Sequence, residues 1–263
     1  MDLQLKGKLA LVSGSTAGIG YAIAHTLARE GAAVIVNGRT QAAVDQAVER
    51  IRAETQGTVH GHAGDMSRAE VAEQAVRRFP GIAILVNNLG IFEAKAFEDI
   101  PDEDWTRFFE VNVLSGVRLA RLVLPEMKRA DWGRIIFISS ESGVQIPTEM
   151  IHYGMTKTAQ LAVSRGLAES VAGTGITVNS VLPGPTRSRG AGDFFDDLAR
   201  SSGKSPEQIE AEFFEHVRPS SLIQRFATPQ EVASLVAYVA SPLASATTGA
   251  ALRVDGGVVR SAF

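Results

Sequence analysis

Short apolar runs rich in branched residues alternate along the chain with longer segments in which apolar residues recur at helical spacing. The short runs predict strands, because runs of this length with few polar positions are typical of a buried parallel sheet. The predicted strands cover residues 9–13, 33–37, 58–62, 84–87, 135–139, 177–182 and 251–254. The longer segments predict helices over residues 19–30, 41–55, 68–79, 152–172 and 229–239, with further helical segments around 102–128.

The alternation of these elements predicts the fold class. Strands that alternate with helices of ten or more residues imply right-handed βαβ units and therefore a parallel sheet with helices on both faces. No linker, low-complexity segment or internal repeat divides the chain. We therefore predict a single doubly wound α/β domain over residues 1–263.

One segment, residues 187–218, interrupts the alternation of strands and helices. It carries two phenylalanine pairs, at 194–195 and 213–214, among many acidic residues. An amphipathic helical pair packed on the core would produce this pattern. A substrate lid would produce it as well, because long insertions in compact domains are often lids or binding loops. We favour the lid because of where the segment follows the sheet, shortly after the end of the sixth predicted strand.

Composition and charge exclude several classes of function. The 263 residues are 45% apolar and 21% charged, and the net charge of −3 gives no electrostatic argument for nucleic acid or membrane binding. The absence of cysteine excludes disulfides and thiol catalysis. No signal peptide and no apolar run of about 18 residues are recognisable, so a cytoplasmic location is expected. No metal site is predicted, because His60 and His62 lack a recognisable third ligand.

A glycine-rich stretch, GSTAGIG at residues 14–20, lies between the first predicted strand and the first predicted helix. Glycines in such a turn let the backbone approach a pyrophosphate, whose charge is favoured by the N-terminus of the following helix. The spacing is GxxxGxG rather than GxGxxG, and a plain glycine turn could have the same composition. At the first βα turn of an α/β chain, the stretch predicts a dinucleotide site.

Tyr153 and Lys157 stand four residues apart in the predicted helix 152–172. Side chains at i and i+4 are neighbours on one helix face. An ammonium beside a phenol stabilises the phenolate and so favours loss of the phenolic proton. A coincidental pair on a solvated helix face is the alternative for an isolated YxxxK.

Several motifs in one order decide between these alternatives, because together they resemble the short-chain dehydrogenase/reductase family. Within it, the chain is most similar to bacterial oxidoreductases that include the 3-oxoacyl-carrier-protein reductases. The resemblance covers nearly the whole chain and implies a Rossmann domain. The motifs are GSTAGIG at 14–20, Asp65 after the third predicted strand, NNLG at 87–90, Asn112 in EVNVLSG, Ser139-Ser140, YGMTK at 153–157, PGPT at 183–186 and VDGG at 254–257.

The resemblance implies a catalytic set of Asn112, Ser140, Tyr153 and Lys157. Tyr153 would exchange a proton with the substrate oxygen during hydride transfer with a nicotinamide, and Ser140 would orient that oxygen. Lys157 would lower the pKa of Tyr153 from its free value near 10 and hold the nicotinamide ribose. Asn112 would hold a water molecule that links Lys157 to solvent.

The resemblance also implies the residues that bind the cofactor. Asp65 would contact the adenine, and residues 183–186 would close over the nicotinamide carboxamide. Leu89 departs from the alanine that is usual in the family, so it could narrow the cofactor site. The complete set is Gly14, Ser15, Thr16, Gly18, Ile19, Gly20, Arg39, Asp65, Met66, Asn88, Gly90, Tyr153, Lys157, Pro183, Gly184, Thr186 and Ser188.

Two residues predict which nicotinamide cofactor is used. A carboxylate at the end of the second strand would accept the ribose 2′-hydroxyl of NAD and repel the 2′-phosphate of NADP. By alignment with the family, Gly38 occupies that place, and Arg39 follows with a guanidinium suited to phosphate. A solvated loop arginine would give the same sequence. We predict NADP(H), with NAD(H) as the alternative.

The predicted function is an oxidoreductase that interconverts a carbonyl and a secondary alcohol with NADP(H). The alternatives are an NAD-dependent alcohol dehydrogenase of the same fold and a non-catalytic dinucleotide-binding sensor, which would not need the tyrosine. The resemblance also implies a homo-oligomer, with a tetramer favoured. The apolar residues of the predicted helix 152–172 that could serve an interface, or equally the core, are Ala159, Ala162, Val163 and Leu167.

Overall fold

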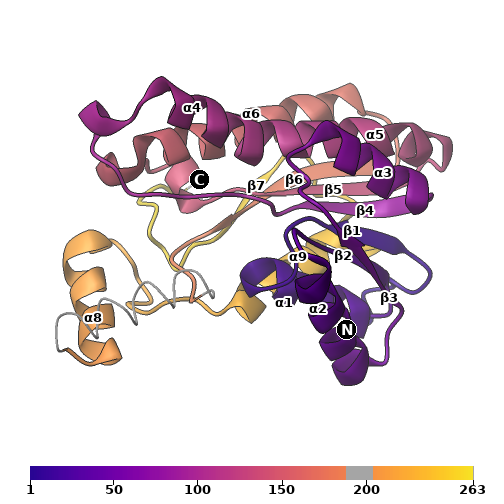
Figure 1. Ribbon diagram of the computed structural model, residues 1–263, viewed down its shortest axis with the longest axis horizontal. Coiled ribbons are helices and arrows are strands. Elements are labelled where there is room, and N and C mark those ends of the chain that lie inside the picture. Colours follow the sequence, from indigo (N-terminus) through magenta and orange to yellow (C-terminus); the bar gives the residue numbers. More distant parts are fainter. Residues whose placement is uncertain (188–203, 263) are drawn as a thin grey trace.

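A computed structural model describes residues 1–187 and 204–262 and confirms the α/β architecture (Figure 1). Within these residues, seven parallel strands form one sheet in the order β3-β2-β1-β4-β5-β6-β7. Residues 1–8 precede the first strand, which lies inside this sheet between the second and the fourth. The strands are β1 (Leu9–Val12), β2 (Ala33–Gly38), β3 (Val59–Ala63), β4 (Ile82–Asn87), β5 (Gly133–Ile138), β6 (Ile176–Pro183) and β7 (Ala251–Val254).

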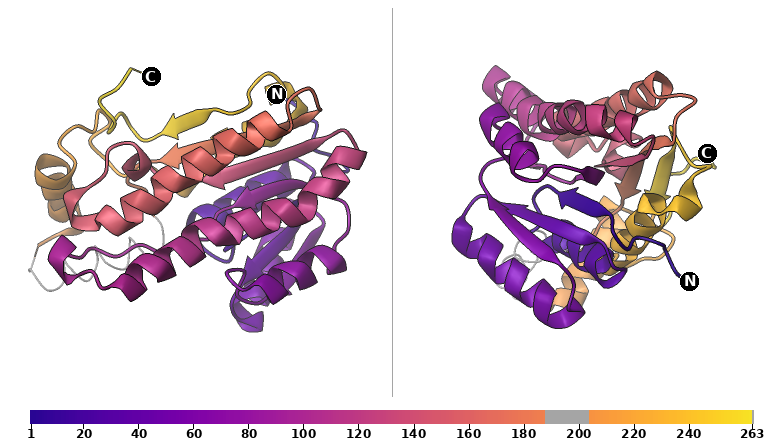
Figure 2. Two further views of the ribbon diagram at one scale, coloured as in Figure 1. Left: turned by 90° about the horizontal axis from the view of Figure 1, so that it is seen from above. Right: turned by 90° about the vertical axis from the view of Figure 1, so that its right-hand side faces the viewer.

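Helices cover both faces of the sheet, as Figure 2 shows. One face is covered by α1 (Gly18–Arg29), α2 (Gln41–Thr55) and α9 (Pro229–Ala240). The other is covered by α3 (Ala69–Arg78), α4 (Asp102–Phe109), α5 (Ser115–Arg129) and α6 (Ile151–Ser170). Short helical turns connect these elements: η1 (Phe97–Asp99), η2 (Glu110–Leu114), η3 (Glu141–Gly143), η4 (Thr148–Met150), η5 (Phe213–Val217) and η6 (Pro242–Ala244).

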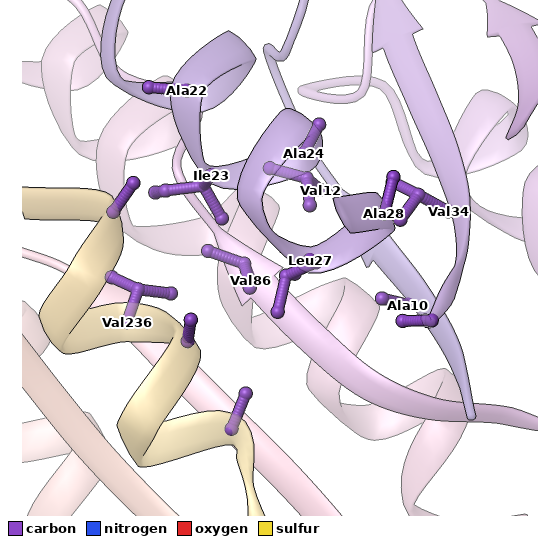
Figure 3. Packing of buried hydrophobic residues seen from close by; sticks show 14 of the residues in the cluster. Ala10, Val12, Ala22, Ile23, Ala24, Leu27, Ala28, Val34, Val86 and Val236 are labelled. Carbon is purple, nitrogen blue, oxygen red and sulfur yellow. The ribbon is translucent and has the colours of Figure 1, made fainter. Parts of the chain in front are cut away.

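The core on the first face forms where α1 and α9 pack together over the sheet (Figure 3). Ile23 and Leu27 of α1 lie at the i, i+4 spacing that predicted this helix, and both are fully buried. They pack in one cluster with Val236 of α9 and with Val12 and Val86 of the strands. Each fully buried Leu, Ile or Val side chain stabilises the fold by about 1.5–3 kcal/mol. Burial of one helix face therefore fixes α1 and the loop that precedes it.

The strands have side chains in both cores, which explains their continuous apolar runs. Ala10 and Val12 of β1 belong to the first core, whereas Leu11 belongs to the second. The second core contains Leu119 of α5 and Phe137 of β5, both with exposures of 1% or less. Successive side chains of a strand point to opposite faces, so a strand covered by helices on both sides has no polar face.

Residues 187–218, predicted as a lid, are described only in part. The pair at 194–195 lies outside the described residues. Residues 204–218 form α8 (Pro206–Glu212) and η5, at one end of the sheet (Figure 1). Phe214 is 2% exposed, and its ring lies 5.1 Å from that of Phe226. This second phenylalanine pair therefore packs on the chain itself, and the lid assignment stays a prediction.

The described helices include none that is long and apolar enough to cross a membrane. Residues 1–187 and 204–262 also contain no group of three or more His, Asp or Glu side chains that could hold a metal ion.

Candidate active site

A cavity of about 230 Å³ lies at the carboxyl ends of β1, β4, β5 and β6. The strand order reverses direction between β1 and β4, and ligands of open α/β sheets bind at such a switch point. Most of the residues that line the cavity are predicted site residues: Ile19, Asn88, Gly90, Ser140, Tyr153, Lys157, Pro183, Gly184 and Thr186. The others are Ile91, Phe92, Ile138 and Ser139.

The glycine loop fits a pyrophosphate by its shape. A Cβ atom at Gly20 would lie 2.3 Å from the Gly14 carbonyl oxygen and 2.5 Å from Asn88 Nδ2, so only glycine fits there. Gly14 and Gly18 adopt positive φ angles of 61° and 57°, which other residues rarely adopt. Ala17 is the N-cap of α1 and has no side chain that could cap the helix. The free N–H groups of the first turn can therefore bind an anion.

Asn37, which the sequence motifs do not include, holds this loop in place. Its Oδ1 accepts a hydrogen bond of 3.0 Å from the Gly14 N–H, and its Nδ2 donates to the Gly64 carbonyl at 3.0 Å. Asn88 Nδ2 donates to the Ser13 and Gly14 carbonyls at 3.0 and 2.9 Å. The amides of the buried Asn37 and the half-buried Asn88 thus fix the loop in the protein without a ligand.

Three other predicted cofactor residues also make contacts within the protein. The N–H of Ser15 donates to the Asn37 carbonyl, and its hydroxyl donates to the Val12 carbonyl at 2.6 Å. Asp65 Oδ1 accepts from the N–H and hydroxyl of Ser67. Met66 is fully buried in the second core. These contacts shape the cofactor side of the site, and direct binding by these residues stays a prediction.

Arg39 is the candidate for recognition of the ribose 2′-position. It is exposed immediately after β2, and no carboxylate of the described residues forms an ion pair with it. A Cβ atom at Gly38 would lie only 2.4 Å from Thr16 Cγ2. Thr16, Gly38 and Arg39 therefore lie together at the end of β2. Thr16 leaves no room for a side chain at residue 38, and the neighbouring Arg39 guanidinium is not paired with a described carboxylate.

The predicted tyrosine–lysine pair lies on one face of α6. The Lys157 ammonium is 5.5 Å from the centroid of the Tyr153 ring. Its Nζ donates to the Ile138 carbonyl at 2.9 Å and to Gln160 Oε1 at 3.3 Å. The Lys157 side chain is buried. Its two acceptors lie at the end of β5 and on α6, so they hold the ammonium beside the cavity.

Asn112 lies where the regular helix is interrupted by the π-helical turn η2. Such turns free backbone groups and are frequent at functional sites. The Asn112 carbonyl accepts a hydrogen bond of 2.6 Å from Gln160 Nε2, and its side chain bonds both the N–H and the carbonyl of Ile91. A Cβ atom at Gly90 would lie 3.5 Å from both Asn112 Oδ1 and Lys157 Nζ, so the two groups converge on one point.

The electrostatics of the pair correct one expectation. Burial raises the pKa of the Tyr153 phenol above its ordinary value, the nearby Glu141 carboxylate raises it further, and a hydrogen bond with Ser140 opposes both. The expected low pKa of Tyr153 is therefore not present in the protein without cofactor, because burial has the largest effect, and the effect of Lys157 on the phenol during catalysis stays a prediction. Burial lowers the pKa of Lys157 to about 8, against the opposing effect of Glu141.

The far wall of the cavity is formed by residues that follow β6. Gly184 packs so closely on the end of β7 that a Cβ atom would lie 2.5 Å from the Asp255 carbonyl oxygen. The Thr186 hydroxyl donates to the Gly184 carbonyl at 2.9 Å. Asp255 in turn accepts hydrogen bonds from the N–H groups of Gly257 and Val259. The PGPT and VDGG motifs thus meet at the adjacent carboxyl ends of β6 and β7, while Ser188 lies outside the described residues.

His152, the neighbour of Tyr153, predicts a pH dependence of stability. It is fully buried, its ring lies 4.1 Å from that of Phe108, and neither ring nitrogen has a hydrogen-bond partner in the part of the chain that is described. Burial lowers its pKa. The unfolded chain then binds more protons than the folded chain as pH falls below about 6.5, so stability is lost on acidification. We expect His152→Met to make the fall of the melting temperature between about pH 7 and 5 shallower.

His216, whose side chain is 68% exposed, provides the matched control. Because it is not buried, His216→Gln should leave the pH dependence of the melting temperature unchanged. A His152 variant with the same pH dependence as the unmodified protein would contradict the prediction.

Comparisons with known proteins agree with this geometry. A family model described as enoyl-(acyl carrier protein) reductase matches residues 14–259. The uncharacterized oxidoreductase YvrD of Bacillus subtilis is 49% identical over 99% of this chain and 100% of its own length. D-beta-hydroxybutyrate dehydrogenase of Cupriavidus necator is 37% identical over 97% and 99% of the two chains. L-sorbose reductase of Gluconobacter frateurii, solved with NADPH and L-sorbose, superposes with a TM-score of 0.94 at 30% identity over 99% and 100%. The chain therefore belongs to the short-chain dehydrogenase/reductase family and is an oxidoreductase.

Proposed function

We propose that this protein is an NADP(H)-dependent carbonyl reductase, in which Tyr153 gives a proton to the substrate oxygen as a secondary alcohol is formed. The observation that carries the proposal is the arrangement of Ser140, Tyr153 and Lys157 around one cavity of about 230 Å³. A phenol whose pKa lies above its ordinary value is protonated at neutral pH. A protonated phenol is the general acid that carbonyl reduction requires.

Each of the other residues would have a defined part in the proton transfer. The Ser140 hydroxyl would position the substrate oxygen next to the phenol. Lys157 remains largely protonated at pH 7, because its pKa is about 8, and its charge would stabilise the phenolate that is left behind. Asn112 would hold a water molecule between Lys157 and solvent, since Asn112 Oδ1 and Lys157 Nζ converge near Gly90.

The glycine loop fits a dinucleotide. When such a cofactor is bound, its nicotinamide supplies the hydride. The uncapped N-terminus of α1 would bind the pyrophosphate, and the exposed Arg39 would bind a 2′-phosphate. Gly90, Pro183 and Gly184 would border the nicotinamide end, because they line the same cavity as Tyr153. The NADPH in the solved L-sorbose reductase supports the same choice of cofactor.

The test of this function is a screen of neutral ketones, 3-oxo acids and their alcohols with NADPH, NADH, NADP⁺ and NAD⁺. Turnover is measured by the absorbance of the reduced nicotinamide. Faster oxidation of NADPH than of NADH by at least one carbonyl compound is the expected result. Turnover restricted to NAD⁺ and alcohols would replace the proposal by an NAD-dependent alcohol dehydrogenase. Cofactor binding with no turnover across the screen would favour the dinucleotide-binding sensor.

We also propose that the protein is a homotetramer in the cytoplasm. Ala162 of α6 is exposed and Ala159 and Val163 are half-buried, so this helix has small apolar side chains available for a second copy. If two copies of this helix pack about a two-fold axis, each copy would bury these residues against the other. Light scattering during gel filtration at micromolar concentration should give about four times 28.0 kDa. Elution as a monomer would contradict the proposal.

A further inference from the structure

Glu141 is a buried carboxylate at the edge of the candidate active site, and it belongs to none of the sequence motifs. It is 5% exposed and is the only buried glutamate among residues 1–187 and 204–262. Its Oε2 accepts hydrogen bonds from the hydroxyl of Ser140 and from the N–H and hydroxyl of Ser142, at 2.8 and 3.1 Å for Ser142. A buried charge is costly unless it is paired and hydrogen-bonded, so Glu141 needs a compensating cation in addition to these donors.

The charge of Glu141 is compensated from a distant part of the sequence. Arg218, which directly follows η5, places its Nε 3.4 Å from Glu141 Oε1. The Arg218 side chain is itself only 13% exposed. Its Nη1 also contacts Glu149 Oε1 of η4 at 3.1 Å, but the Glu149 side chain is 44% exposed. Arg218, the last residue of the segment predicted as a lid, thus joins that segment to the residue beside Ser140.

The contact with Glu141 determines what the Ser140 hydroxyl can do. A serine hydroxyl has one proton and two lone pairs. In this structure the proton is directed at Glu141, and the oxygen accepts from the Ser142 N–H at 3.1 Å. The same oxygen lies within hydrogen-bonding reach of Tyr153. Glu141 therefore fixes the rotation of this hydroxyl before a substrate is bound, and the same proton turns to the substrate oxygen when one binds.

We propose that Glu141 is a positioning residue for proton transfer, which orients Ser140 against Tyr153, and that Arg218 holds Glu141 in that place. The proposal rests on the proposed function, because it assigns a part to Ser140 and Tyr153 in one reaction. Glu141 acts through Ser140 and does not itself contact the substrate. The ion pair also connects the end of the segment 204–218 to Ser140 through Glu141. The conformation of that segment therefore affects how Ser140 is positioned.

The negative charge of Glu141 acts on both titratable groups of the site in the same direction. It raises the pKa of Tyr153 and that of Lys157. The other charged groups packed around this part of α6 are Arg218 and Glu149, already described, and a network near His152. That network consists of Glu93, Lys95, Asp104 and Arg107. Removing only the charge of Glu141 should therefore lower the pKa values of Tyr153 and Lys157 together.

The experiment compares Glu141→Gln with the unmodified protein, because glutamine keeps the shape and an acceptor oxygen but not the charge. Without any cofactor, the Lys157 Cε signal is titrated by NMR and assigned with Lys157→Arg. Its midpoint, about 8 in the unmodified protein, should fall by at least about half a pH unit. With a substrate from the ketone screen, the pH above which reduction declines should fall in parallel.

Glu149→Gln is the matched control, because it removes the other carboxylate that contacts Arg218 without touching Ser140. It should leave both pH midpoints unchanged. A Glu141→Gln variant that is less stable but has unchanged midpoints would overturn the proposal and leave Glu141 a structural residue. If no ketone is reduced by the unmodified protein, the proposed function fails, whereas the NMR titration still tests the effect of Glu141.

A double-mutant cycle tests the part assigned to Arg218. Arg218→Gln leaves the Glu141 charge buried and unpaired, which is strongly destabilising. The double variant Glu141→Gln with Arg218→Gln removes both charges, so it should have a higher melting temperature than Arg218→Gln alone. Additive losses of melting temperature in the two single variants would show that Arg218 does not hold Glu141.

Discussion

Tyr153→Phe should lower carbonyl reduction by about 10²–10⁴-fold, the range that is typical for loss of a general acid. The change removes one hydroxyl from a half-buried ring and keeps the ring's contact with Phe92 at a centroid distance of 6.4 Å. The fold and the affinity for NADPH should therefore remain. Ser140 keeps its hydrogen bond to Glu141 in the variant, so the loss would report the missing proton alone.

The measurement is the steady-state rate with a ketone from the screen, together with the dissociation constant of NADPH from fluorescence titration. Tyr238→Phe is the matched control, since Tyr238 is 39% exposed on α9, on the opposite face of the sheet. It should retain the full rate. Comparable activity in Tyr153→Phe and Tyr238→Phe would refute the assignment of the proton donor.

The fold was largely predictable, because burial of strands between two helical layers leaves a clear pattern in the sequence. The helix Gln41–Thr55 and the strand Ala251–Val254 have the predicted bounds. The strand β4 begins at Ile82 instead of residue 84. The π-helical turn Glu110–Leu114 could not be predicted, because one extra residue in a turn barely alters the spacing of apolar residues.

The candidate site was predictable only as far as its motifs extend. Eight of the residues expected to bind the cofactor line one cavity with Ser140. The supporting residues Asn37 and Gln160 were not foreseen, because an amide in a strand or helix has no distinctive spacing. The direction of the Tyr153 pKa shift was also not predictable. It depends first on burial of the phenol and then on Glu141, and both are produced by tertiary packing, with Arg218 from a distant segment beside Glu141.

The second large effect concerns the choice between the two cofactors. NADPH should bind more tightly than NADH by roughly tenfold to a hundredfold. A hydrogen bond to a charged group contributes about 1.5–3 kcal/mol, which converts to that ratio. The preference would come from Arg39, which is exposed and forms no ion pair with the described carboxylates. Arg39→Ala should abolish it by weakening NADPH alone, and higher salt should weaken NADPH more than NADH.

Reversal of the preference needs a carboxylate at residue 38, and the structure determines how it can be introduced. A Cβ atom there would lie 2.4 Å from Thr16 Cγ2, so Gly38→Asp with Arg39→Ala alone would also disturb the glycine loop. Adding Thr16→Ser removes that methyl group and keeps the hydroxyl. The triple variant should prefer NADH, because the carboxylate accepts the 2′-hydroxyl and repels the 2′-phosphate.

Dissociation constants of both cofactors, measured by calorimetry for each variant, test this interpretation of the loop. Arg77→Ala on α3 is the control for loss of one surface cation, since Arg77 is 68% exposed and, among the described residues, forms an ion pair only with Glu73. It should leave both constants unchanged, because its charge lies on a helix that contributes no residue to the cavity. Equal affinities for NADPH and NADH in the unmodified protein would mean that Arg39 is a solvated arginine and that the 2′-position is not recognised. A preference that persists in Arg39→Ala would instead assign the recognition to another cation.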